Sequence, residues 1–100
     1  MTPKQIISAV SKITGIRYGL IACSMRATGA GDARALAVWG IMQTCKNVRQ
    51  SDIADLLNQS QGSISRTVDR AQAMIETCPK FRAMRDQLQA MIEEAREVAA

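Results

Sequence analysis

The chain has 100 residues, of which 47% are hydrophobic and 22% are charged, a balance typical of one globular domain rather than of a disordered or fibrous chain. It contains no histidine, which excludes histidine-based catalytic triads, histidine metal sites and imidazole pH switches. No apolar run approaches the roughly 18 residues of a membrane span. The first residues also lack the long apolar stretch of a secretory signal. We therefore expect a cytoplasmic protein with no membrane partner.

The cysteines are three in number and far apart in the sequence: Cys23, Cys45 and Cys78. They form no CxxC pair, so the sequence indicates neither a zinc knuckle nor a redox motif. Cysteine without such a partner is usually a small, buried apolar residue. We expect all three to be reduced core residues, as suits a reducing compartment.

The excess of basic over acidic residues is unevenly distributed along the chain. Residues 1–70 contain nine basic and four acidic side chains, whereas residues 71–100 contain four basic and five acidic side chains. The positive excess therefore lies outside the C-terminal segment. An excess of this size permits nucleic-acid binding but does not establish it.

Helix-starting and helix-ending residues define two helices at the beginning of the chain. Thr2 can cap the first helix, Pro3 suits its first position, and Gly15 can end it in a left-handed turn. Apolar residues recur between these signals at helical spacing. A second, short helix is predicted over 18–24.

The third predicted helix covers 33–46, after a glycine-rich loop over 27–31. Asp32 is a plausible cap for this helix. The helix is apolar nearly all round, which predicts that it is the central helix of the core. We expect Trp39, which lies within this apolar stretch, to anchor the core rather than to stack on a nucleic-acid base.

The pattern that follows is a helix-turn-helix. Ser51 can cap a short helix, and Ser60 can cap a second helix of about 61–76. Ala54 supplies the small residue that is needed where the two helices cross closely. Asn58, four residues later, tolerates the left-handed geometry of a tight turn.

The outward face of the second motif helix carries short polar and cationic side chains. This composition differs from that of an ordinary solvated helix face, which usually favours Glu and Lys. In a DNA major groove, Gln pairs with adenine, Arg pairs with guanine, and Ser contacts base edges or phosphate. An ordinary solvated face is the alternative interpretation. The predicted base-reading residues are Gln61, Ser63, Ser65 and Arg66. The predicted contacts to the DNA backbone or minor groove are Arg26, Arg34, Lys46, Arg49, Ser60 and Arg70.

The last predicted helix covers 80–98 and carries a heptad-like apolar seam. Its members are spaced alternately three and four residues apart: Phe81, Met84, Leu88, Met91, Ala95 and Val98. The seam can pack onto the chain's own core, or it can pair with a second copy to form a homodimer. About three to four heptads would be needed to indicate a coiled coil by themselves, so both interpretations stay open.

Residues from about Ile6 to Ile75 resemble the C-terminal DNA-binding domain, domain IV, of the bacterial replication initiator DnaA. The matching pieces are Ile16-Arg17, the loop at Arg26, the segment Ala33-Arg34-Ala35-Leu36-Ala37 and the segment Asp52-Ile53-Ala54-Asp55-Leu56-Leu57. The family's Asp-His-Thr-Thr signature is replaced by Ser60-Gln61-Gly62-Ser63, and the ATPase module of the initiator has no counterpart.

This resemblance implies roles for individual residues. Arg26 falls where the family inserts an arginine into the minor groove, and Arg34 falls where it contacts phosphate. Gln50 and Ser51 fall where the first motif helix meets the DNA backbone. The resemblance also implies that residues 1–78 form a helix-turn-helix DNA-binding region.

Together these patterns predict an all-α, compact bundle of about six helices, with the long amphipathic helix of 79–100 in the same domain. We expect a nucleoid-associated protein that binds double-stranded DNA sequence-specifically, as a small transcriptional regulator of phage or mobile-element origin. The first alternative is replication-origin binding or an initiator-accessory role. The second is a protein-interaction adaptor that uses the Met-rich C-terminal helix. The sequence shows no group of acid/base, nucleophilic or metal-binding residues that could form one active site. We therefore expect that the protein is not an enzyme and has no cofactor or small-molecule substrate.

Overall fold

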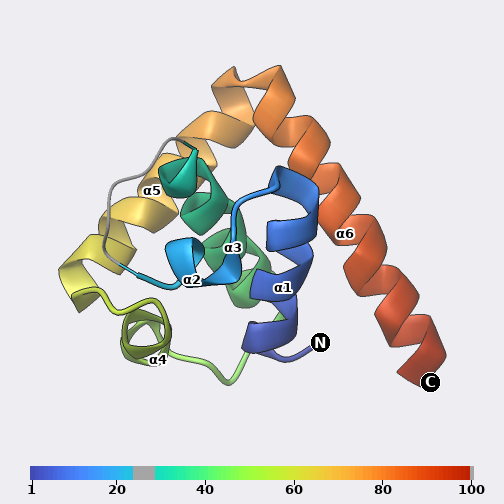
Figure 1. The fold of residues 1–100 in the computed structure, drawn as a ribbon, viewed down its shortest axis with the longest axis horizontal. Helices are drawn as coiled ribbons and strands as arrows, with labels where there is room; N and C mark the ends of the chain where they lie inside the picture. The colour runs from blue at the N-terminus through green and yellow to red at the C-terminus, as the bar shows by residue number, and fades with distance from the viewer. Residues whose placement is uncertain (24–28, 100) are drawn as a thin grey trace.

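A computed structural model describes residues 1–23 and 29–99 of the chain, without the side chains of 98 and 99. The described residues form six helices and no strand, which confirms the predicted all-α class (Figure 1). The helices are α1 (Pro3–Thr14), α2 (Tyr18–Ile21), α3 (Ala30–Thr44), α4 (Gln50–Leu56), α5 (Gln61–Thr77) and α6 (Pro79–Ala99). None of them is long and apolar enough to cross a membrane.

Helix α3 is the central helix of the bundle, as its apolar sequence predicts. It packs against α1, α2, α5 and α6 (Figure 1). Because it is surrounded, residues on all its sides are buried: Ala30, Ala33, Arg34, Ala35, Leu36, Ala37, Val38, Gly40 and Ile41. Trp39 is only half-buried at the edge of this core, where the guanidinium carbon of Arg85 lies 5.9 Å from its ring centroid, within cation–π range.

The two ends of α1 follow the sequence signals closely. The Thr2 hydroxyl accepts a hydrogen bond from the Gln5 backbone N–H at 3.2 Å, and the Gln5 side chain accepts one from the Thr2 N–H at 2.8 Å. This reciprocal pair is a capping box, which satisfies two backbone donors at the helix start. Gly15 ends the helix with a φ of 75°, a left-handed conformation that glycine adopts without steric cost.

The predicted starts of two helices are wrong. Helix α3 begins at Ala30, after Gly29 with a φ of 81°, so Asp32 lies inside the first turn and is not the cap. Helix α4 begins at Gln50, so Ser51 also lies inside its helix. At α4 the Asp52 carboxylate accepts a hydrogen bond from the Arg49 backbone N–H at 3.0 Å. The predicted side-chain cap is thus absent at α4, and the Asp52 carboxylate instead bonds back to the N–H of the residue before the helix.

Helix α6 packs along its own chain, against α1, α3 and α5 (Figure 1). Phe81 and Leu88 are fully buried in the core, and Met84 and Met91 are partly buried against it. The interpretation in which the seam packs onto the chain's own core is therefore confirmed. Phe81 and Leu88 were also candidate contacts between two copies, and this is corrected because neither side chain is exposed.

The three cysteines are free and only half-buried, so they are less enclosed than predicted. Cys45 donates a hydrogen bond from Sγ to the Met1 carbonyl oxygen at 3.4 Å. Burial raises the pKa of the Cys45 thiol, because a low-dielectric environment disfavours the thiolate. Cys23 donates from Sγ to the Leu20 carbonyl oxygen at 3.3 Å.

Candidate nucleic-acid interface

The turn between α4 and α5 is built on Asn58. This residue has a φ of 55°, the only positive φ outside glycine among the described residues. Its N–H donates to the Asp55 carbonyl at 3.3 Å, and the N–H of Gln59 donates to the Ala54 carbonyl at 2.8 Å. These two bonds form a Schellman motif, which ends a helix at a left-handed residue. The four residues of the turn thus give α5 a fixed direction relative to α4.

A small apolar cluster holds the two helices together. Ile53, Leu57 and Ile64 are fully buried, and Ala54 is 4% exposed. Ala54 is small, as the close approach of α4 to α5 requires. Val68 is half-buried against the same core. The core-facing side of this helix-turn-helix therefore agrees with the sequence pattern.

The first turn of α5 is stabilised by a series of linked hydrogen bonds. Ser60 Oγ accepts from the Ser63 backbone N–H at 3.1 Å and donates to Ser63 Oγ at 3.0 Å, so Ser60 caps α5 as predicted. Arg66 Nη2 donates to the same Ser63 hydroxyl at 3.1 Å. The Ser63 side chain is therefore occupied within the helix, and the Arg66 guanidinium is held over the first turn.

The predicted base-reading residues differ in exposure. Gln61, Ser65 and Arg66 are exposed, whereas Ser63 is half-buried. Gly62, the second residue of the helix, is also exposed and adds no side chain next to Gln61. Asp69 is exposed on the turn that follows Arg66 and places a negative charge between Arg66 and Arg70 in the sequence.

Arg34 lies in a different environment from the phosphate contact predicted for it. The residue is 8% exposed. Its Nε donates to the Ile21 carbonyl at 3.1 Å, and its Nη2 donates to the Leu20 carbonyl at 2.7 Å. The guanidinium thus satisfies carbonyls at the C-terminal end of α2, which a helix end leaves without partners. The Arg34 side chain therefore attaches α2 to α3, and its contact with phosphate stays a prediction.

Arg70 lies on the side of α5 that faces the start of α3. Its Nη2 is 2.7 Å from Asp32 Oδ1, and the side chains are 55% and 43% exposed, respectively. Sequence reasoning placed Arg70 on DNA and missed this partner, because 38 residues separate the pair. An exposed pair of this kind contributes little stability, typically about 0–1 kcal/mol, so phosphate can compete for the guanidinium.

Four of the other predicted backbone contacts lie on or just before α4, whereas Ser60 caps α5. Arg49 and Lys46 are exposed before α4, and Gln50 and Ser51 are half-buried in its first turn. Arg26 lies outside the described residues. The structure therefore brings Arg49, Gln50 and Ser51 to the start of one helix, next to the helix that carries Gln61 and Arg66 (Figure 1).

Comparisons with protein-family models, with curated proteins and with solved structures gave no match.

Proposed function

We propose that this chain binds double-stranded DNA through α4 and α5, with the N-terminal half of α5 in the major groove. The observation that supports the proposal is a helix-turn-helix with a fixed turn at Asn58, whose second helix begins with two exposed residues and has no acidic residue in its first turn. A major groove admits an α-helix whose leading residues reach base edges.

The side chains at the leading end match this role. Arg66 can donate to guanine and Gln61 can bond adenine on two edges. Both are exposed, and neither takes part in an ion pair found among the described residues. Gly62 lets the helix backbone approach the groove closely, since no side chain intervenes.

Phosphate contacts would come from the start of α4 and from the flank of α5. Arg49 is exposed immediately before α4, and Arg70 is half exposed one turn beyond Arg66. Such contacts position a protein on the duplex without reading its sequence. Ser60 and Ser63 hold the first turn of α5 at the surface through the cap hydrogen bonds.

A small regulator of transcription is the biological role that we favour, because an exposed helix that reads the major groove is a common device for sequence-specific duplex binding. The resemblance to DnaA domain IV favours a second role, at a replication origin or beside an initiator. Genome-wide occupancy distinguishes the two, because a regulator occupies promoters and an origin factor occupies an origin.

The test begins with selection of a preferred duplex from a random library by the full-length chain. Arg66→Ala and Gln61→Ala should each weaken binding to that duplex by about 1–3 kcal/mol, with a smaller loss on random duplex. Arg82→Ala, which removes an exposed arginine from α6, is the matched control and should leave affinity nearly unchanged.

Two outcomes would contradict the proposal. Absence of duplex binding even at low salt would overturn it, since phosphate attraction is strongest there, and would favour the adaptor role. An equal loss for Arg82→Ala and Arg66→Ala would show that net charge, rather than α5, carries the binding. Circular dichroism spectra of all variants would confirm that the helices remain intact.

A further inference from the structure

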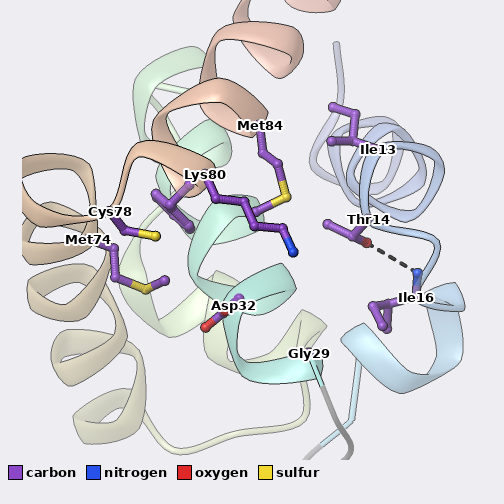
Figure 2. Close-up of a pocket in the computed structure, with 10 residues that line it drawn as sticks. Ile13, Thr14, Ile16, Gly29, Asp32, Met74, Cys78, Lys80 and Met84 are labelled. Atoms are coloured by element: carbon purple, nitrogen blue, oxygen red, sulfur yellow. Dashed lines mark hydrogen bonds between the residues drawn. The ribbon is translucent and has the colours of Figure 1, made fainter.

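A pocket of about 210 Å³ lies between the C-terminal ends of α1 and α5 and the N-terminal ends of α3 and α6. None of the residues proposed to contact DNA lines it. Its wall is mainly apolar, with side chains from all four helices and from the segment after α1 (Figure 2). The lining residues are Ile13, Thr14, Ile16, Gly29, Asp32, Met74, Cys78, Lys80, Phe81 and Met84.

Two charged side chains interrupt this apolar wall. The Lys80 side chain extends across the pocket from the first turn of α6, and the Asp32 carboxylate lies below it (Figure 2). Asp32 is paired with Arg70 at 2.7 Å, whereas neither ion pair found among the described residues involves Lys80. The cation is therefore the charge that the pocket offers to a ligand.

We propose that this pocket binds a small organic anion, namely a carboxylate on an aromatic or branched aliphatic body. The ligand's apolar body would lie against Ile16, Met74 and Met84, and its carboxylate would face the Lys80 ammonium. The size is sufficient, because an apolar cavity of about 150 Å³ accepts benzene. A site with apolar walls and one or two convergent polar groups is the usual form of a small-molecule site.

The pocket is connected to α5 through Asp32, which lines it and also holds Arg70. Removal of Arg70 from Asp32 by a phosphate would leave the Asp32 charge uncompensated beside the ligand and lower the affinity for an anion. By thermodynamic reciprocity, a bound anion would lower DNA affinity by the same factor. This regulatory consequence rests on the proposed DNA binding, whereas ligand binding itself does not.

The experiment uses the full-length chain without DNA and titrates it with benzoate, with benzyl alcohol as the uncharged analogue. Methyl resonances of Ile13, Ile16, Met74 and Met84 should shift and saturate with benzoate. Lys80→Gln should lower benzoate affinity by about threefold or more, as expected for one charge pair in high dielectric. Arg82→Gln, which removes a neighbouring cation outside the pocket, should not.

The link to α5 is tested in the same titration. Arg70→Gln should lower benzoate affinity by about threefold, and Asp32→Asn should raise it by a similar factor. Absence of saturable shifts in these methyl groups, or equal affinity for benzoate and benzyl alcohol, overturns the proposed site. Equal affinity in the wild type, Arg70→Gln and Asp32→Asn overturns the link. Because no arm contains DNA, failure of the proposed DNA binding would leave these results unchanged.

Discussion

A Cβ atom on Gly40 would lie 2.8 Å from Cδ2 of Leu88, closer than real side-chain contacts allow. It would also lie 3.0 Å from Cγ2 of Ile6. Leu88 and Ile6 are fully buried, in α6 and α1, respectively. Gly40 is therefore the point of close contact between α3 and both α1 and α6. Because it has no side chain, the three helices can pack this closely.

Gly40→Ala should lower the free energy of unfolding by roughly 1–2 kcal/mol, because overpacking exceeds the gain of about 1 kcal/mol in helix propensity. Urea denaturation would measure the change. Gly19→Ala is the matched control, since a Cβ there meets nothing within 4 Å and should stabilise the chain or leave it unchanged. A Gly40→Ala variant as stable as the wild type would contradict the close approach.

Asn58→Val should destabilise the chain by about 1–2 kcal/mol, because a β-branched residue adopts the left-handed region at that cost. Asn58→Gly should be neutral or slightly stabilising. Asn47→Val provides the comparison, as Asn47 is an exposed turn residue without a positive φ. Equal stability of the two valine variants in thermal denaturation would argue against the Schellman motif as the basis of the turn.

The elements that sequence reasoning predicted well are those determined by local chemistry. The capping box at Thr2, the left-handed end at Gly15, the turn at Asn58 and the cap at Ser60 each depend on a few neighbouring residues. Where two residues could start the same helix, local reasoning was not sufficient. Asp52 acts at the start of α4, where Ser51 was the predicted cap.

The contacts that sequence reasoning missed are long-range. Arg34 reaches the end of α2, and Asp32 reaches Arg70 on α5. Neither partner can be inferred from spacing along one helix, because the chain folds back between them. The pocket beside Lys80 was missed for the same reason, since its walls come from distant helices. The helical spacing of the α6 seam predicted an apolar face but could not tell which surface covers it.

Leu88→Ala should lower the free energy of unfolding by about 2–5 kcal/mol, as expected for a leucine truncated in a core. Gln89→Ala, at the exposed neighbouring position, should change stability by less than about 0.5 kcal/mol. Because Phe81 and Leu88 are covered within one chain, light scattering should give the mass of a single chain for both the wild type and Gln89→Ala. If the wild type is a dimer and Leu88→Ala gives monomers of undiminished stability, the seam instead joins two copies.

Arg34→Lys should destabilise the chain by about 1.5–3 kcal/mol, because a hydrogen bond from a charged group to a buried carbonyl is lost and one ammonium cannot reproduce the planar guanidinium. Arg49→Lys is the control, since Arg49 is exposed and the lysine keeps the positive charge. It should stay within about 0.5 kcal/mol of the wild type.

Urea denaturation and duplex affinity should be measured on both variants. If Arg34 acts by attaching α2 to α3, Arg34→Lys loses stability, and its duplex affinity falls only with the folded fraction. An Arg34→Lys variant of unchanged stability with weakened duplex binding would instead support the phosphate contact that the resemblance to DnaA implies.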